Sequence, residues 1–470
     1  MRKQTKRILI PCAAAAFTIG ATMMSFAAAG WQEEGGVWKY YNSDGDYATE
    51  SWKKSGDNWF WLDSDGEMAT DTLVEDDDDY YYVNEAGAMV KNEWRQLDNT
   101  DDSDDASETC WYYLGPNGKA YKASGSGKTS FKTIGGSKYA FDEEGRMLYG
   151  WVDEESGRVT EEDAWKTGVY YLGDNGDGAL RTNKWERLEV EDDENDNDDF
   201  EGFYWFWFGA NGKKAQDTTK TINGQKYRFE ENGNAVSNWF SVASSSTASS
   251  SDMYYNQPDQ CWRAQGWFKS VPDENIDPEG YEDGDEYWYY AQKSGELVKS
   301  EIRKINGQYY GFDEYGKMLY GLYKMSVNDR QIQSYEKIED EDDLPKEDDA
   351  WQVYYFGDTP KEGVMKTGTT RIEVDGETYT YEFRKSGGQR GEGYDGIQDG
   401  ALYIKGRLLK ADKDAKLEKV TYNGEEYLIN TSGKLQKNKT NVKDGDDKYY
   451  CTDGNGAVTY EGNEKQEKED

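Results

Sequence analysis

The chain has 470 residues, of which 15% are aromatic and only 35% hydrophobic of any kind, and 94 acidic residues against 55 basic ones give it a formal net charge of −39. A net charge this negative disfavours direct binding of nucleic acid or of anionic lipid. The absence of histidine excludes Ser-His-Asp and Cys-His catalysis as well as histidine-based metal sites.

The N-terminal segment has the pattern of an export signal. A basic start with Arg2 and Lys3 is followed by a largely apolar run from Ile8 to Phe26, and three alanines then precede Gly30. We therefore predict a signal peptide over residues 1–29, removed from a secreted protein. The alternative is an uncleaved membrane anchor, because the apolar run is nearly long enough to span a bilayer.

An aromatic repeat begins directly after this segment. A run of aromatic residues starting at Trp38 is followed by a turn glycine, and the same arrangement returns at Trp59 and Tyr80. These first turn glycines are 21 residues apart: Gly45, Gly66 and Gly87. Repeats at a fixed spacing are typical of arrays in which each unit packs on its neighbours. About fourteen units of this kind can be followed to about Tyr460.

The sequence pattern of each unit predicts a two-stranded β-hairpin. The first strand opens with a tryptophan in many units, at Trp52, Trp94, Trp151, Trp185, Trp239 and Trp267. A tight polar turn follows, as at Asn223-Gly224 and Asn306-Gly307, and the aromatic run forms the second strand. Because an isolated hairpin is marginally stable in water, we expect stacked hairpins that share an aromatic core. The predicted fold is an all-β solenoid built from repeats of about 20 residues.

Acidic stretches interrupt the repeats, mostly between the first strand and the aromatic run, where we expect solvated hairpin tips. They are Glu75–Asp79, Asp98–Asp105, Glu189–Asp199, Pro272–Glu286 and Glu339–Asp349. The resulting organisation is a signal peptide at 1–29, repeats with acidic insertions at 30–240, a Ser-rich linker at 241–252, a second repeat array at 253–386, divergent repeats at 387–460 and a disordered charged tail at 461–470.

The sequence gives little support for metal binding, for disulfides or for glycosidase chemistry. Asp63 and Asp174 begin segments that resemble calcium loops, but both coincide with the turn of the repeat, so we favour a turn. Cys110, Cys261 and Cys451 are far apart, and we expect unpaired thiols at strand positions. Paired carboxylates are unavoidable among 94 acids, and no long segment free of repeats is left for a catalytic domain.

The order Gly-Trp, Trp-Tyr-Tyr and Asp-x-x-Gly-x-Met resembles the cell-wall-binding repeat family, which includes choline-binding and glucan-binding repeats of Gram-positive surface proteins. The resemblance implies a non-catalytic protein at the cell wall or cell surface that needs no cofactor. Its partner would be choline-bearing teichoic acid, held by cation–π contacts between hairpins. The family's aromatic cage carries over onto Trp31, Trp38, Tyr40, Trp52, Trp59, Trp61, Met68 and Tyr82.

Three alternatives stay open. Lys138, Val169 and Lys226 replace the first aromatic residue in later units, and the neighbouring sequences are closer to glucan-binding repeats. A structural or adhesive spacer could instead use its acidic face to bind cations or host proteins. A degenerate enzyme domain could occupy Tyr323–Lys410, where the repeats are weakest.

Overall fold

The computed structural model describes residues 29–467, except 100–106, 126, 156, 194, 196–199, 242–252, 348–349 and 360–361. Nearly all of the expected signal peptide, nearly all of the expected linker and the last three residues lie outside the described residues.

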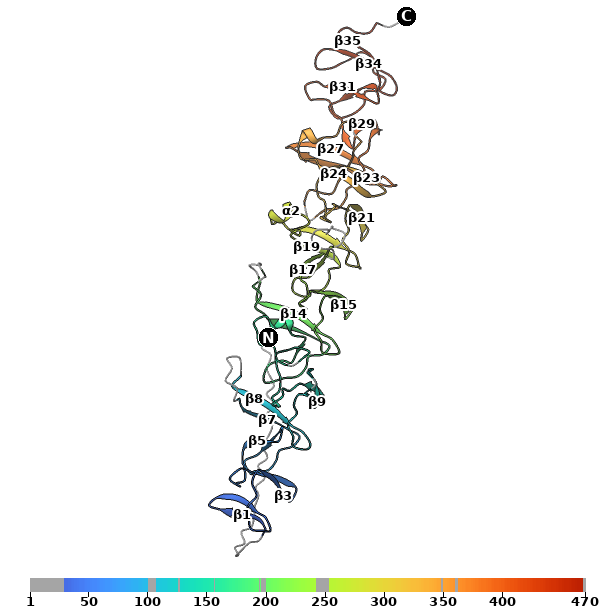
Figure 1. The fold of residues 1–470 in the computed structure, drawn as a ribbon. Coiled ribbons are helices and arrows are strands. Elements are labelled where there is room, and N and C mark those ends of the chain that lie inside the picture. The colour runs from blue at the N-terminus through green and yellow to red at the C-terminus, as the bar shows by residue number, and fades with distance from the viewer. Residues whose placement is uncertain are drawn as a thin grey trace. The chain divides into compact units, whose positions relative to one another are not determined.

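The described chain is all-β and consists mainly of antiparallel hairpins, as the sequence predicts. It divides into two compact units, Met1–Thr219 with Arg228–Ala235, and Lys220–Tyr227 with Val236–Asp470. In the first unit hairpins follow one another in chain order (Figure 1). Their strand pairs are β1 (Gly30–Glu34) and β2 (Val37–Tyr41), β3 (Ser51–Ser55) and β4 (Asn58–Leu62), β5 (Thr72–Asp76) and β6 (Asp79–Val83), β7 (Glu93–Asp98) and β8 (Thr109–Leu114), β9 (Lys132–Ile134) and β10 (Ser137–Tyr139), β11 (Trp151–Val152) and β12 (Tyr170–Tyr171), and β13 (Lys184–Glu189) and β14 (Phe203–Phe208).

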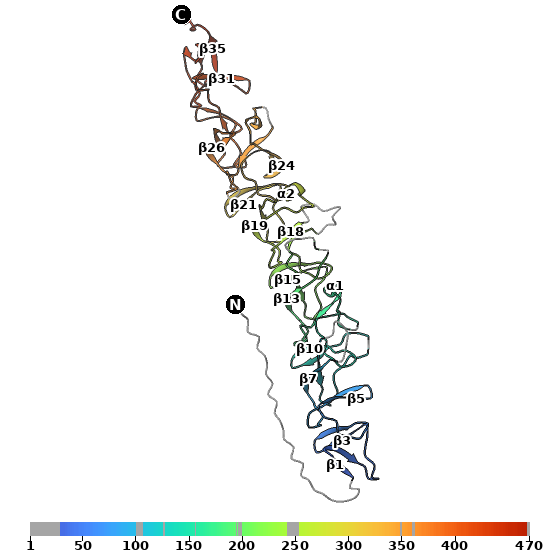
Figure 2. The ribbon, with the colours of Figure 1, turned by 90° about the vertical axis from the view of Figure 1, so that its left-hand side faces the viewer.

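The division between the units falls within the hairpin of β15 (Thr218–Ile222) and β16 (Gln225–Phe229). The second unit combines hairpins with larger sheets (Figure 2). Its hairpins are β17 (Asn238–Ser241) with β18 (Met253–Asn256), β19 (Gly266–Ser270) with β20 (Tyr287–Ala291), and β31 (Leu417–Tyr422) with β32 (Glu425–Asn430).

Two five-stranded sheets and one three-stranded sheet complete the second unit. The first has the order β22 (Gln308–Phe312), β21 (Glu301–Ile305), β24 (Gln331–Lys337), β23 (Leu322–Asn328) and β25 (Gln352–Tyr355). The second has the order β26 (Gly368–Val374), β27 (Glu377–Phe383), β30 (Arg407–Leu408), β29 (Ala401–Ile404) and β28 (Gly396–Gln398). The third contains β33 (Val442–Lys443), β34 (Tyr449–Thr452) and β35 (Val458–Gly462), so two residues of the expected tail belong to a strand.

Helices are short among the described residues. They are α1 (Ala164–Thr167), α2 (Pro278–Glu282) and the 3-10 helix η2 (Glu341–Asp343). None of the described helices is long and apolar enough to cross a membrane.

The turns explain why the glycine period is so regular. Gly66 has a φ of 70°, and a Cβ built on it would lie 2.2 Å from the ring of Tyr47. Gly87 has a φ of 75°, and its Cβ would lie 2.9 Å from Sδ of Met68. Glycine is therefore required at each position for two reasons. The backbone is left-handed there, and a side chain from the preceding turn occupies the space where a Cβ would lie.

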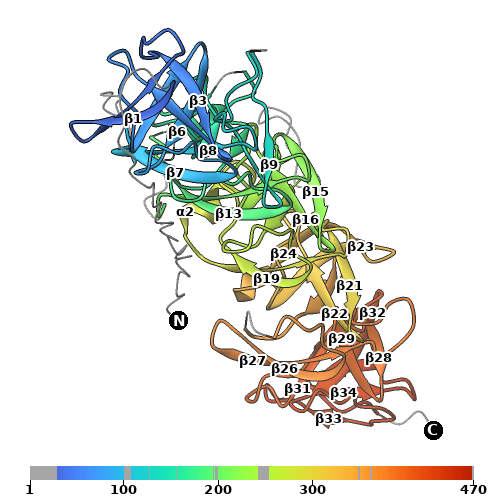
Figure 3. The ribbon, with the colours of Figure 1, turned by 90° about the horizontal axis from the view of Figure 1, so that it is seen from below.

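Backbone hydrogen bonds join each hairpin to the one before it. The N–H of Met68, after the second hairpin, donates to the carbonyl of Trp38 in the first hairpin at 2.8 Å. The N–H of Met89 donates in the same way to the carbonyl of Trp59 at 2.8 Å. These bonds connect residues 30 positions apart, so they fix the order of neighbouring hairpins without a continuous sheet. Seen from below, the strands β1, β3 and β7 of the first unit run in different directions (Figure 3).

The core is assembled from adjacent hairpins. One cluster brings Trp52 and Trp61 of the second hairpin against Val74 and Tyr81 of the third. The most deeply buried position follows the aromatic run directly and is aliphatic in the N-terminal hairpins: Leu62, Val83 and Leu114 are fully buried.

The expected location of the acidic insertions is confirmed for four of the five, because each of these four lies between two paired strands. Glu339–Asp349 instead connects β24 to β25, which pair with β23 and not with each other.

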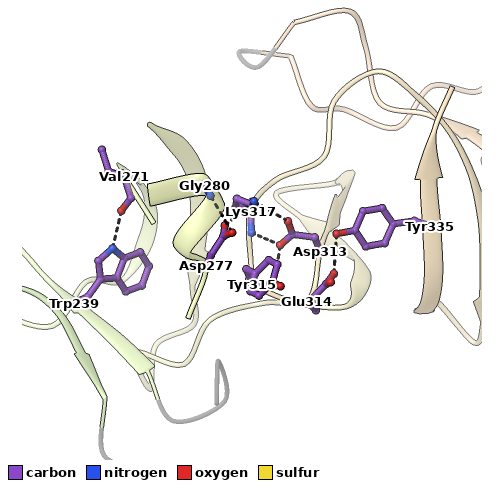
Figure 4. A network of polar contacts seen from close by, with 9 residues as sticks. All are labelled: Trp239, Val271, Asp277, Gly280, Asp313, Glu314, Tyr315, Lys317 and Tyr335. Atoms are coloured by element: carbon purple, nitrogen blue, oxygen red, sulfur yellow. Dashed lines mark hydrogen bonds and ion pairs between the residues drawn. The ribbon is translucent and has the colours of Figure 1, made fainter. Parts of the chain in front are cut away.

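The expectation that the insertions are merely solvated is wrong for Pro272–Glu286. Asp277 is only 6% exposed, accepts the N–H of Gly280 as the N-cap of α2, and forms an ion pair of 2.7 Å with Lys317 (Figure 4). A buried carboxylate needs such partners to offset its lost hydration.

The three cysteines of the described chain are buried and free. Cys110 and Cys451 lie on β8 and β34, as expected. Cys261 lies outside the strands with a φ of 57°, so the prediction of a strand position is wrong for this residue.

Candidate functional site

The eight candidate residues lie on the first three hairpins, and the cross-strand register determines which of them meet. Trp31 is paired with Tyr40, and their ring centroids are 5.5 Å apart. Trp52 is paired with Trp61, and these ring centroids are 5.3 Å apart. Two aromatic pairs are thus formed, each within one hairpin, whereas the sequence led us to expect a cage between neighbouring hairpins.

A third aromatic ring, from the next hairpin, packs against the opening tryptophan of each pair. The ring of Trp31 contacts that of Phe60 edge to face, with the ring centroids 5.4 Å apart. The ring centroids of Trp52 and Tyr81 are 5.0 Å apart. Neither Phe60 nor Tyr81 was among the candidates. Because side chains alternate along a strand, the second residue of each aromatic run points back toward the preceding hairpin, and this two-residue period could have identified both.

Trp52 has the surroundings of a structural residue. Its indole N–H donates to Oδ2 of Asp76 at 3.0 Å, and its ring packs between Trp61 and Tyr81. Aromatic pairs with this geometry stabilise a fold beyond the area that they bury.

Trp38 and Trp59 occupy the start of the aromatic run, toward the hairpin tip. Trp59 shares a face with Trp61 and Trp52, but its side chain remains 37% exposed. Trp38 is half-buried, and its carbonyl accepts the N–H of Met68. The structure therefore places Met68 beside the strand that carries Trp38, while the rings at this position retain contact with solvent.

Two candidate rings already face a cation of the chain itself. Nζ of Lys53 lies 5.2 Å from the ring centroid of Tyr40, and the guanidinium of Arg95 lies 5.4 Å from that of Tyr82. These contacts show that the ring faces between consecutive hairpins accept a positive charge.

Tyr82 is the most enclosed of the eight candidates. It is buried, and its hydroxyl donates to Oδ1 of Asp71. Burial, together with this hydrogen bond to a carboxylate, raises the pKa of Tyr82 to about 12. The hydroxyl therefore stays protonated at neutral pH and serves to fix the ring.

The carboxylates of the turns accept hydrogen bonds from backbone N–H groups. Oδ1 of Asp63 accepts the N–H groups of Asp65 and Glu67, both at 2.9 Å, and Oδ1 of Asp174 accepts the N–H of Gly176 at 3.0 Å. No cluster of three or more potential metal-ligating side chains occurs in the part of the chain that the structure describes.

Comparison with known families identifies the repeats directly. Residues 48–94 match the choline-binding repeat, and residues 109–120 match the putative cell wall binding repeat. These two segments carry cell-wall-binding repeats of the choline-binding family. These repeats are a binding module, and the matched segments include Trp52, Trp59, Trp61, Met68 and Tyr82.

The curated relative that matches is Glucosyltransferase-S of Streptococcus mutans, 25% identical over 211 residues. That match covers 45% of this chain but only 11% of the relative's own length. Solved structures with similarity come from Streptococcus pneumoniae. The modular autolysin LytC is 19% identical over 64% of this chain and 55% of its own, with a TM-score of 0.36. Choline binding protein F is 19% identical over 71% of this chain and 99% of its own, with a TM-score of 0.38.

Proposed function

We propose that the protein is exported, associates with the cell wall without catalysing a reaction, and binds choline-bearing teichoic acid or a related surface polymer. Its contacts are aromatic faces between consecutive N-terminal hairpins. The half-exposed tryptophans at the start of the aromatic runs, Trp38 and Trp59, receive the quaternary ammonium, and Met68 borders the site.

The observation that carries this proposal is the exposure of Trp59 on a face that is otherwise packed. Trp52 and Trp61 on the same face contact the next hairpin, whereas the ring of Trp59 is 37% exposed. A large aromatic ring held at the edge of a packed interface offers an apolar, electron-rich surface to a cation that carries methyl groups. The excess of acidic residues would also raise the local concentration of cationic ligands.

We also propose that the hairpins form a solenoid. The recurring bonds from Met68 to Trp38 and from Met89 to Trp59 support it, since the same link between neighbours is repeated along the chain. In a solenoid each pair of neighbouring hairpins offers a similar site. Several weak sites on one polymer chain then act together.

The experiment that tests the function is retention of the chain from residue 30 onward on purified cell walls, with and without free choline. Choline should release the protein, while sodium chloride at the same ionic strength should not, because a dehydrated aromatic contact is screened little by salt. Binding that is lost in salt and unaffected by choline would assign attachment to the acidic surface instead.

Glucan is the second candidate ligand. Lys138, Val169 and Lys226 stand where the N-terminal hairpins have an aromatic residue, so the cation–π argument is weaker there. The similarity to a glucosyltransferase agrees with this alternative. Release of wall-bound protein by soluble glucan but not by choline would select it.

A further inference from the structure

A hollow of about 220 Å³ lies within the second unit, whereas the N-terminal aromatic sites belong to the first. It is bordered by the turn between β23 and β24, by β25 and by the loop at residues 388–392. The side chains that matter for its chemistry are Arg330, Arg390, Gln352, Tyr354, Asp329 and Glu392.

The two arginines of the hollow converge on one aromatic ring. The guanidinium of Arg330 lies 4.3 Å from the ring centroid of Tyr309, and that of Arg390 lies 5.8 Å from it. Nζ of Lys304 lies 5.8 Å from the same centroid. In the described part of the chain none of these three cations forms an ion pair, although acidic residues outnumber basic ones by 94 to 55.

The hydrogen-bonding capacity of the guanidiniums is largely unused. Nη1 of Arg390 donates to the carbonyl of Lys385, while its Nε is buried without an acceptor among the described residues. An arginine has five N–H donors in a planar fork, which suits a carboxylate or a phosphate.

The backbone at Arg330 indicates that this side chain has a role of its own. Asp329 and Arg330 form a hairpin turn with positive φ values of 45° and 66°. The corresponding turns of related hairpins have glycine at the second position, at Gly307, Gly376 and Gly424. A residue with a side chain is disfavoured in this conformation, so an arginine is retained here against the local backbone preference.

We propose that this hollow binds an anionic group, a phosphate or a carboxylate, of the polymer to which the protein attaches. Arg330 and Arg390 donate to its oxygens, and the amide of Gln352 lies on the same wall. The proposal rests on the proposed attachment to a surface polymer but not on choline recognition, because the hollow and the N-terminal aromatic faces have no residue in common.

The hollow also has acidic residues, which limit its affinity for anions. Asp329 is exposed, and Oε1 of Glu392 accepts an N–H of Gln389 at 3.4 Å. Removing the charge of Glu392 should therefore strengthen the binding of an anion.

The test is titration of the full chain from residue 30 onward with inorganic phosphate and, separately, with acetate, followed by calorimetry. Arg330→Gly restores the glycine of the related turns, so this variant should fold at least as stably as the parent while losing about tenfold or more in anion affinity. Arg390→Gln should lose a similar factor, and Glu392→Gln should gain affinity. Arg371→Gln is the matched control, because Arg371 is an exposed arginine of β26 in the same unit.

Tighter binding of phosphate than of acetate would identify a phosphate group as the natural ligand, and the reverse would identify a carboxylate. Two results would overturn the proposal: no binding of either anion by the parent chain, or an Arg330→Gly variant that folds and binds as the parent does. Retention on cell walls is measured in parallel, so a failure of the wall-binding function is recognised separately.

Discussion

Tryptophans on a single hairpin face differ in what surrounds them, and this difference separates a structural ring from a ligand-binding ring. Trp52 packs between Trp61 and Tyr81 and donates to Asp76, whereas Trp59 is 37% exposed. Trp52→Ala should cost about 3–5 kcal/mol of unfolding free energy through the cavity that it leaves. Trp59→Ala should cost about 1 kcal/mol or less and act on ligand binding instead.

The binding measurement compares choline retention of the Gly30–Trp94 fragment with that of the full chain. One cation–π contact contributes about 0.5–2 kcal/mol, so Trp59→Ala should weaken retention of the fragment about two- to thirtyfold. The full chain should lose much less, because its other sites remain. Phe203→Ala in the full chain is the control, since Phe203 is 38% exposed and lies on a later hairpin. Retention of the fragment that is unchanged by Trp59→Ala would contradict a special role for Trp59.

Lys214 should make the stability of the first unit depend on pH. The residue is 5% exposed, and its ammonium donates to the carbonyls of Trp165 and Lys166 and lies 5.1 Å from the ring centroid of Trp151. Burial lowers its pKa from 10.5 to about 7. Between these values the unfolded chain binds more protons than the folded chain, so the contribution of Lys214 to stability should rise as pH increases from about 7 to about 10.

Lys214→Met should remove this rise and raise the melting temperature at neutral pH. The measurement is the melting temperature of parent and variant at several pH values in that range. Lys213→Met is the matched control, because the neighbouring side chain is exposed and paired with Glu154. An unchanged pH profile in Lys214→Met would show that the carbonyls and the ring keep the ammonium charged at all these pH values.

At the scale of elements, the acidic insertions are of two kinds. The stretch Asp98–Asp105 ends β7 and continues into residues outside the described part of the chain. Its deletion should change the unfolding free energy by no more than about 1 kcal/mol, because the length of a surface loop affects its closure only weakly. EDTA should leave the melting temperature nearly unchanged. A large effect of either treatment would indicate a packed or metal-bound segment.

The insertion Pro272–Glu286 should behave differently, because Asp277 fixes it to Lys317. Asp277→Asn removes the charge that pairs with Lys317 and should cost about 3–5 kcal/mol of unfolding free energy, typical of breaking a buried pair. Hydrogen exchange at α2 should speed up in the same variant. Glu286→Gln is the control, since Glu286 forms an exposed pair with Lys269. Equal stability of the two variants would mean that the insertion is held by its other contacts.

At the scale of the whole molecule, the fold predicts an unusual circular dichroism spectrum. The described helices are single turns, and the regular structure of the described chain is otherwise made of strands, many of them rich in Trp and Tyr. The spectrum should show β-structure and strong aromatic bands with little helix. A helical content near one third, which is ordinary for globular proteins, would contradict the fold.

Much of this architecture is local and therefore visible in the sequence. The glycine period follows from turns that require positive φ, and the Asn-Gly turn of β21 and β22 has the expected left-handed pair, Asn306 at 49° and Gly307 at 89°. The opening tryptophans lie at the starts of first strands, as their spacing predicts. Each of these features depends on a few consecutive residues, so neighbouring repeats could not obscure it.

The tertiary structure alone decided which rings remain available. Alternation along a strand defines two faces, but it does not say which face the next hairpin covers. That is set by non-local contacts such as the bond from Met68 to Trp38, and it brought Phe60 and Tyr81 into the core beside Trp31 and Trp52. The buried Asp277, the enclosed Lys214 and the convergence of Arg330 and Arg390 on Tyr309 arise in the same way. The partners that decide these sites, Lys317, Trp165 and Tyr309, lie about twenty residues or more away in sequence, so no local pattern predicts these contacts.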